Sequence, residues 1–105
     1  MKKQSTKQKN GNPYVIIRAQ GAGVFAGELV KRDGTTVELR NSRRLWHWSG
    51  AASLSELAVR GTSKPGECKF PVVVPEQTVM GVLEVLRCTD LARQSLEGVK
   101  EWSVK

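Results

Sequence analysis

An Asp-Gly pair lies between two runs of mainly apolar and β-branched residues, in the stretch VFAGELVKRDGTTVELR, residues 24–40. Asp-Gly favours a tight hairpin turn because both residues tolerate positive φ. After the turn, Val37 and Leu39 alternate with Glu38 and Arg40, which is the period-2 pattern of a strand with one buried face. The stretch therefore predicts a half-buried antiparallel hairpin, around which the rest of the fold has to be built.

Further extended segments predict a sheet of about five or six strands. YVIIRA, residues 14–19, is rich in β-branched residues and predicts the first strand. After a short break at Asn41 and Ser42, RRLWHW (residues 43–48) can form another strand. In CKFPVVVP, residues 68–75, the prolines favour an edge strand. The long apolar run over residues 79–88 predicts the central strand.

Two short helices complete the prediction, and the fold class is α+β with a mainly antiparallel, twisted sheet. Ser53 as N-cap and Glu56 three residues later form a capping box at the start of the first helix. Gly61 is its predicted stop. The second helix, in LARQSLEGV, follows the candidate N-caps Thr89 and Asp90 and is expected to turn Leu91 and Leu96 inward.

The length of 105 residues fits one domain, which we expect over residues 13–105. Residues 1–12, MKKQSTKQKNGN, offer almost no apolar surface to bury and predict a disordered basic tail. No apolar run approaches the roughly 18 residues of a membrane span, and the basic N-terminus lacks the apolar stretch of a secretory signal. We therefore expect a cytoplasmic protein without membrane contacts. Because its core is modest, we also expect a homo-oligomer.

The net charge of +7 is concentrated in the first part of the chain. Residues 1–44 hold ten Lys and Arg against three acids, whereas residues 45–105 hold seven of each. Four of the lysines belong to the predicted tail, which leaves +3 for residues 11–44. Arg18 and Arg40 contribute to this patch, which predicts a moderately basic surface on the folded domain.

Sequence signatures of catalysis and of metal binding are missing. The chain has no nucleophile elbow, no P-loop and no metalloprotease motif, so we predict no catalytic residues and no cofactor. Cys68 and Cys88 are twenty residues apart and His47 is the only histidine, which fits neither a disulfide framework nor a zinc site. We expect two buried free thiols on neighbouring strands.

The stretch RRLWHWSGAASLSEL, residues 43–57, combines cations, aromatic rings and a helix start. Guanidinium groups hold phosphates and tryptophan rings stack on bases, so the stretch suits a nucleotide. Amides at a helix start can bind an anion. Two simpler interpretations stay open: both tryptophans belong to the core, and Ser53 with Glu56 only caps the helix. The candidate ligand-binding residues are Arg18, Arg40, Arg43, Arg44, Trp46, His47, Trp48, Ser53 and Ser55.

The same stretch, together with CKFPVVV and EVLRCTDLA, resembles a family of small proteins of unknown function encoded by tailed bacteriophages and prophages. The resemblance covers residues 14 to about 102 and is most specific in the RRLWHWSGAASLSEL segment. It implies an accessory protein that acts in the cytoplasm of a host bacterium. By analogy, one class of such proteins binds and sequesters cyclic dinucleotides or ADP-ribose derivatives that bacterial defences use as signals.

Two functional hypotheses follow. In the first, an oligomer without catalytic activity sequesters a small anionic nucleotide, held by arginine and stacked on tryptophan. In the second, the basic tail and strand arginines bind the backbone of a nucleic acid while Trp46 or Trp48 stacks on its bases. A structural or host-protein-binding role is a further alternative. An enclosed pocket favours the first hypothesis, and an open basic groove favours the second.

Overall fold

The computed structural model describes residues 11–104, which form a five-stranded antiparallel sheet packed against two helices. The α+β fold class is therefore confirmed. The predicted tail, residues 1–12, lies almost entirely outside the described residues. The elements are β1 (Tyr14–Ala19), β2 (Gly23–Asp33), β3 (Thr36–Arg44), α1 (Leu54–Arg60), the single-turn 3₁₀ helix η2 (Pro65–Glu67), β4 (Val74–Val79), β5 (Val82–Arg87) and α2 (Asp90–Glu97).

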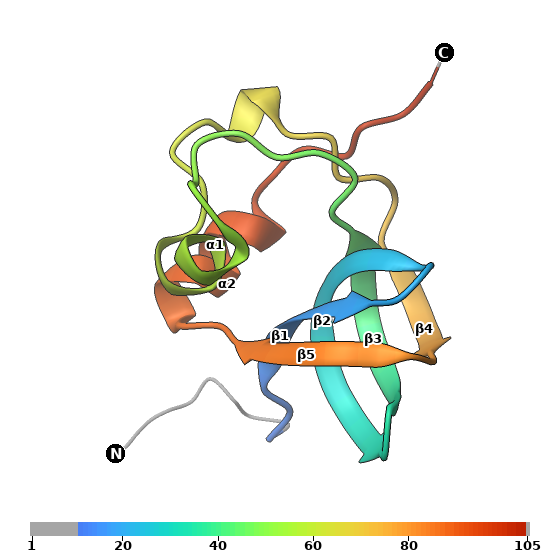
Figure 1. The fold of residues 1–105 in the computed structure, drawn as a ribbon. Helices are drawn as coiled ribbons and strands as arrows, with labels where there is room; N and C mark the ends of the chain where they lie inside the picture. Colours follow the sequence, from blue (N-terminus) through green and yellow to red (C-terminus); the bar gives the residue numbers. More distant parts are fainter. Residues whose placement is uncertain (1–10, 105) are drawn as a thin grey trace.

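The sheet curls strongly, so that its two edges approach each other at one end. Its strand order is β4-β3-β2-β1-β5, yet only Met80 and Gly81 separate β4 from β5 along the chain. Figure 1 shows the ends of β4 and β5 meeting at the right of the sheet. The Val82 N–H donates to the carbonyl of Thr35 at 2.9 Å, which ties the start of β5 to the β2–β3 turn. The molecule is therefore a partly closed barrel.

The predicted central strand over residues 79–88 is wrong. Val79 ends β4, and β5 begins at Val82 on the opposite edge of the sheet. Gly81 has φ +76°, a conformation that glycine adopts without steric cost, and it allows the chain to turn there. The apolar run resembles one strand because neither residue of the turn is polar.

The β2–β3 hairpin is confirmed, with its turn one residue later than predicted. Asp33 pairs with Thr36, so Gly34 and Thr35 form the two-residue loop. Gly34 has φ +61°, whereas Asp33 keeps a negative φ and stays in the strand. A glycine at the first loop position suits the right-handed twist of a hairpin.

Strand β3 passes through the predicted break and ends earlier than expected. Asn41 has φ +52° and marks a bulge between the pairs Glu28–Arg40 and Ala26–Arg43. A bulge inserts one residue without ending the strand, so β3 continues to Arg44. RRLWHW is therefore not a separate strand. Beyond β3, the Leu45 N–H donates to the Val24 carbonyl at 2.8 Å, and His47 forms an isolated bridge with Lys69.

The edge strand begins later than the sequence indicates. Cys68–Pro75 was expected to be extended as a unit, but β4 covers Val74–Val79. Pro75 lies in this edge strand, where a missing N–H is tolerated. Phe70, upstream of the strand, is fully buried instead.

Two apolar clusters lie on opposite faces of β1. Ile16 packs on the helix side with Leu57 and Leu96, while Val15 and Ile17 pack inside the curled sheet. Figure 1 shows α1 and α2 side by side at one end of the sheet. Strand β1 is thus buried on both faces, which explains its uninterrupted apolar run.

Both helices begin where predicted, with one difference in the orientation of the second. Ser53 caps α1, Gly61 ends it with φ +75°, and Thr89 caps α2. Leu96 is buried as expected, but Leu91 is 63% exposed. In α2 the inward positions are Ala92 and Leu96, four residues apart on one face, and Leu91 falls outside that stripe.

Candidate functional site

Arg43 is a structural residue and not a surface cation. It is 3% exposed, and its guanidinium donates to four backbone carbonyls from Leu96, Val99, Phe70 and Pro71 at 2.8–3.3 Å. Its side chain thereby ties β3 to the end of α2 and to the segment before β4. Arg43 was a candidate ligand-binding residue, but its guanidinium is bonded to these carbonyls and is not exposed to an external anion.

Arg44 lies on the opposite side of β3 and remains partly exposed. Its guanidinium carbon lies 4.5 Å from the centroid of the Phe25 ring, and Nη1 donates to the carbonyl of Ala22 in the β1–β2 turn. Stacking on the ring restricts the side chain, which lowers the entropy lost if Arg44 binds a ligand.

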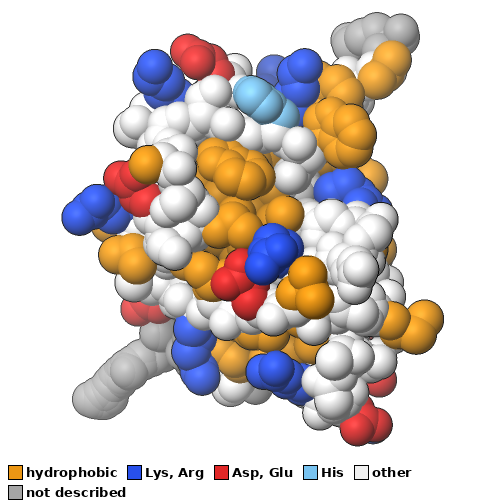
Figure 2. Space-filling model, in the orientation of Figure 1, with side chains coloured by type: hydrophobic (Ala, Val, Ile, Leu, Met, Phe, Trp, Pro, Cys, Tyr) orange, Lys and Arg blue, Asp and Glu red, His pale blue; other side chains and the backbone are white. Residues whose placement is uncertain are grey.

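Trp46 and His47 follow β3 and are exposed. Contacts lead from His47 through Lys69 to Trp102. His47 and Lys69 exchange backbone hydrogen bonds of 3.3 and 2.8 Å. The Lys69 ammonium lies 5.5 Å from the centroid of the Trp102 ring. We call Arg44, Trp46, His47, Lys69 and Trp102 the Trp46 surface. Figure 2 shows the single histidine, pale blue, with basic and hydrophobic side chains beside it.

The two tryptophans at positions 46 and 48 have different roles. Trp46 is 64% exposed, whereas Trp48 is partly buried and packs against the cluster that contains Leu45 and Leu57. Trp48 is therefore part of the core, whereas Trp46 remains a candidate for stacking on a ligand.

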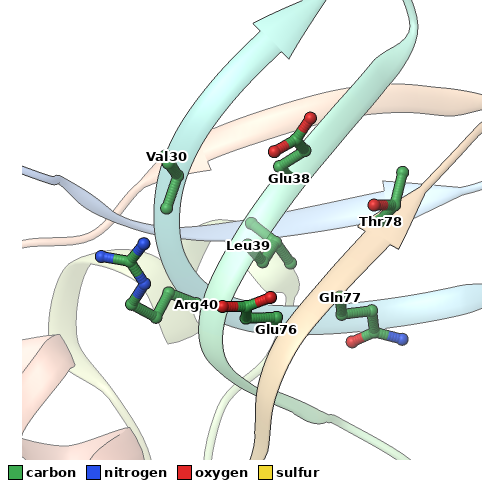
Figure 3. A pocket seen from close by; sticks show the side chains of 7 residues that line it. All are labelled: Val30, Glu38, Leu39, Arg40, Glu76, Gln77 and Thr78. Carbon is green, nitrogen blue, oxygen red and sulfur yellow. The ribbon is translucent and has the colours of Figure 1, made fainter.

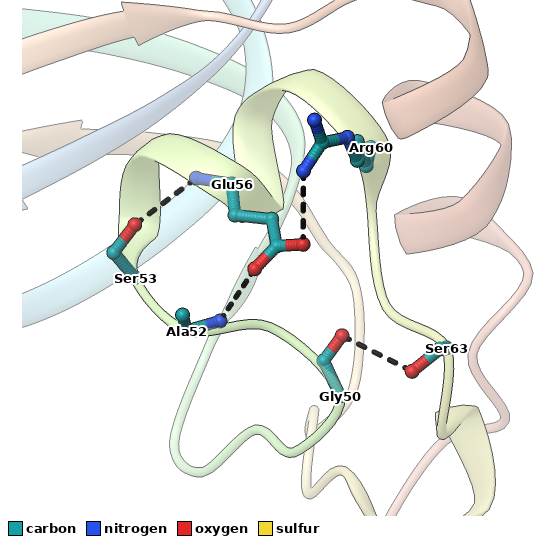
Figure 4. Close-up of polar contacts among 6 residues, drawn as sticks. All are labelled: Gly50, Ala52, Ser53, Glu56, Arg60 and Ser63. Atoms are coloured by element: carbon teal, nitrogen blue, oxygen red, sulfur yellow. Dashed lines mark hydrogen bonds and ion pairs between the residues drawn. The ribbon is translucent and has the colours of Figure 1, made fainter.

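The helix start that was predicted to bind an anion already holds a carboxylate. Ser53 Oγ accepts from the Glu56 N–H at 3.2 Å, and Glu56 Oε1 accepts from the Ala52 N–H at 2.8 Å (Figure 4). Arg60 pairs with the other oxygen of Glu56 at 3.2 Å. Because this capping box pairs the amides of Ala52 and Glu56 and places negative charge at the helix start, Ser53 and Glu56 act as a helix cap. Ser55 is exposed next to it.

The capping box predicts a pH dependence of stability. The backbone N–H of Ala52, and after it Arg60, hold the pKa of Glu56 below its ordinary value of 4.5. A carboxyl whose pKa is lower in the folded state stabilises the fold above its unfolded pKa and loses that contribution as pH falls through the folded pKa. In urea unfolding, Glu56→Gln should be less stable than the wild type at about pH 7, and the difference should shrink as the pH falls through the folded-state pKa of Glu56. An undiminished difference at the lower pH would contradict the assignment.

Arg18 and Arg40 lie apart from the Trp46 surface and face acidic side chains. Arg18 Nε bonds Glu84 Oε1 at 2.7 Å in an exposed pair between β1 and β5. Arg40 lines a groove of about 310 Å³ on β3 and β4 together with Glu38 and Glu76 (Figure 3). Two carboxylates against one guanidinium do not favour an anion there. The structure therefore does not gather the predicted basic patch into one site.

Neither cysteine has the environment of a reactive thiol, and both are free. Cys68 is buried after η2, while Cys88 is partly buried after β5, so the two are not on neighbouring strands as predicted. Burial raises the pKa of Cys88 to about 12, which keeps its thiol protonated and a poor nucleophile. Within residues 11–104, no cluster of three or more His, Cys, Asp or Glu side chains could hold a metal ion.

Sequence reasoning missed Lys69 and Trp102 as parts of the surface. They lie 21 and 54 residues beyond the end of the RRLWHW stretch. The isolated bridge and the docking of the C-terminal segment on Phe70 bring them toward His47. Alternation and local motifs carry no signal for such a contact.

The fold and surface define a small α+β domain with exposed aromatic and cationic groups on loops at one end of a curled sheet. The chain belongs to a family described as a domain of unknown function (DUF6948), whose pattern it matches over residues 12–96. No curated protein and no solved structure matches the chain significantly. In the described part of the chain, neither helix has the length and apolarity needed to cross a membrane.

Proposed function

We propose that this protein binds an anionic nucleotide without transforming it, by stacking a base on Trp46 and holding phosphate with Arg44 and Lys69. The observation that carries the proposal is the 64% exposure of Trp46, which is two residues from Arg44 along the chain and next to His47, whose backbone pairs with that of Lys69. Burying a tryptophan ring releases water from a large apolar area, so such a ring gains free energy when a ligand covers it. A base with its phosphates complements both the ring and the charges.

The openness of the ring favours nucleotides within a single strand. One copy of the chain leaves most of Trp46 in solvent, and Lys69 with Trp102 extends the surface beyond it. A strand can follow such a surface from one base to the next.

A free nucleotide signal, such as a cyclic dinucleotide or an ADP-ribose derivative, is the second candidate. The exposed Trp46 favours it if a second copy of the chain closes over the ring, which would make the homo-oligomer part of the site. The resemblance to phage accessory proteins supports this role, in which the protein would remove a defence signal inside an infected bacterium.

Binding of a labelled oligonucleotide of about twelve bases tests the first form, because stacking is worth about 1–3 kcal/mol per base. We expect Trp46→Ala to weaken binding roughly tenfold or more and to leave the fold unchanged, since the ring is largely in solvent. Fluorescence anisotropy measures affinity and thermal unfolding measures stability. Leu83→Ala is the control, because Leu83 is an exposed apolar residue on β5, away from this surface.

A second arm of the experiment separates the two ligand forms. Calorimetry with cyclic dinucleotides and ADP-ribose, combined with sedimentation equilibrium, reports small-ligand binding and the number of subunits. Tight binding of a small nucleotide to an oligomer, without oligonucleotide binding, favours the second candidate. If neither ligand form binds, or if Trp46→Ala binds both as the wild type does, the proposed function is wrong.

A further inference from the structure

The two edge strands of the sheet have the same length, and each lacks a partner on one side. Within residues 11–104, β4 pairs only with β3 and β5 pairs only with β1, and each strand covers six residues. Figure 1 shows β4 and β5 running apart from the short turn that joins them. The unpaired N–H and C=O groups of an edge strand are a template for pairing with another chain.

The hydrogen bonds to β1 identify which residues of β5 face the free edge. The Cys88 N–H donates to the Tyr14 carbonyl at 2.9 Å, so Leu86, two residues earlier in the same ladder, also bonds β1. The residues between them in an antiparallel ladder turn their backbone groups the other way. Val85 and Arg87 therefore present their N–H and C=O groups at the free edge of β5.

Pro75 identifies the free edge of β4 in the same way. Proline has no N–H, and a proline in an edge strand turns its nitrogen toward the unpaired side. Because the direction alternates along a strand, Gln77 and Val79 also present their backbone groups at the free edge. Each edge thus offers two residues with both N–H and C=O, separated by one residue that faces inward to the sheet.

The two edges match each other in one antiparallel register. Gln77 of one copy lies opposite Arg87 of a second copy, and Val79 lies opposite Val85, so that both pairs exchange backbone hydrogen bonds. Val79 and Val85 both pack on the cluster inside the curled sheet. The pairing therefore continues the apolar side of one sheet into the apolar side of the next.

The same register brings exposed apolar side chains toward each other. Val73, directly before β4, is 44% exposed, and Leu91, in the first turn of α2 after β5, is 63% exposed. Each is four residues from the Gln77–Arg87 pair, on the same end of the contact. Val73 of one copy thus comes toward Leu91 of the next, and covering both side chains removes apolar surface from water.

The charges of the two edges are complementary. Glu84 on β5 already pairs with an arginine of β1 at 2.7 Å, so Arg87 is the uncompensated charge of that strand. Beside β4, Glu38 and Glu76 lie around the single guanidinium of Arg40, which leaves this edge negative. A parallel pairing of the two strands would instead set Glu76 opposite Glu84, and like charges directly opposite each other are destabilising.

We infer that copies of this chain associate head to tail, with the β4 edge of one copy paired to the β5 edge of the next, and that the copies close into a ring. Each copy has one edge of each kind, so the contact is heterologous and continues from copy to copy. Since β4 and β5 run apart from a common turn, each contact rotates the next copy, and a rotation that closes gives a ring. This interface is separate from the nucleotide site proposed at Trp46.

Amide hydrogen exchange and sedimentation equilibrium of the full chain test the contact. We expect the wild type to sediment as a species larger than a dimer. The amides of Val85 and Arg87 should exchange at least about tenfold more slowly in it than in a monomeric variant. Leu86 is the internal control, because its N–H bonds β1 in either state. A monomeric wild type at high micromolar concentration, or equal exchange at Val85 and Arg87 in both states, would overturn the inference.

Val73→Lys and Leu91→Lys supply the monomeric variants, because each blocks a different side of the contact. Both side chains are exposed, so the fold should persist, and each variant alone should associate at least about tenfold more weakly than the wild type. Mixed in equal amounts, the two variants should form a dimer that holds one copy of each, through the one contact that neither substitution alters. Two blocked sides cannot pair, since lysine would face lysine.

Two further variants separate this contact from other surfaces. Val30→Lys introduces the same charge at a side chain that is 40% exposed on β2, away from both edges, and should assemble as the wild type does. Trp46→Ala should also leave the ring intact, which separates the result from the fate of the proposed function. If the mixture of Val73→Lys and Leu91→Lys stays monomeric, or if either variant alone forms a dimer, the copies do not pair head to tail and the inference is wrong.

Discussion

Replacing Arg43 with alanine is expected to lower the free energy of unfolding by about 3–5 kcal/mol, enough to unfold much of a small domain. The substitution removes a buried side chain that lies over the Phe70 ring. It leaves the Val99 carbonyl without its donor and takes one donor each from the Leu96 and Phe70 carbonyls, which keep the N–H groups of Val99 and Trp102. Unsatisfied buried carbonyls add a desolvation penalty to the lost bonds. Urea unfolding followed by circular dichroism measures the loss.

Arg44→Ala is the matched control, because the two arginines are adjacent on β3 and only Arg43 is buried. Loss of the Arg44 contacts with Phe25 and Ala22 should cost about 1 kcal/mol. Arg43→Lys should also be destabilised, since an ammonium cannot reproduce the planar fork that reaches two separate segments. If Arg43→Ala unfolds at the same urea concentration as Arg44→Ala, the four hydrogen bonds do not stabilise the fold as described.

Replacing Gly50 with alanine should cost about 2–5 kcal/mol, through backbone strain and overpacking together. Gly50 has φ +83°, and an added Cβ would lie 2.5 Å from the backbone nitrogen of Lys64 and 2.8 Å from that of Ser63. The Gly50 carbonyl also accepts hydrogen bonds from the backbone and side chain of Ser63 (Figure 4). The clash therefore falls on backbone atoms, which cannot move away as a flexible side chain can.

Gly66→Ala is the control for this substitution. Gly66 does not have positive φ, and an added Cβ would meet nothing within 4 Å, so its stability should be close to that of the wild type. Thermal unfolding of both variants makes the comparison. A Gly50→Ala midpoint within about 2 °C of the wild type would show that the loop accommodates a side chain, against the expectation from its geometry.

Local chemistry was sufficient for the elements whose signals are short in range. Residues 14–19 form β1 with the predicted bounds, and the hairpin differs from its prediction only in the placement of the turn. The capping residues Ser53 and Thr89 start both helices because a side-chain oxygen can satisfy a nearby amide in any tertiary context. A pattern whose cause lies within a few residues is readable from the chain.

The candidate site was less predictable, because each of its features depends on distant partners. Trp46 and Trp48 are indistinguishable in the sequence, and both follow the end of β3, but only Trp48 meets the helix-side cluster. Arg43 and Arg44 are likewise equivalent as residues. Carbonyls from Phe70, Leu96 and Val99 make the first a buried structural residue, whereas the second stays partly exposed on Phe25.

By itself the sequence determined the α+β class, the hairpin and both helix starts, since these depend on backbone preferences and short-range hydrogen bonds. The number and spacing of the cysteines indicated two free thiols. Only the tertiary structure decided the strand order, the bulge at Asn41, the burial of Arg43 and the grouping of Trp46 with Lys69 and Trp102. Each of these is set by which segments meet across the curled sheet. These long-range contacts depend on how the whole chain buries its apolar residues. The free energy of one residue therefore depends on partners that lie tens of positions away in the sequence.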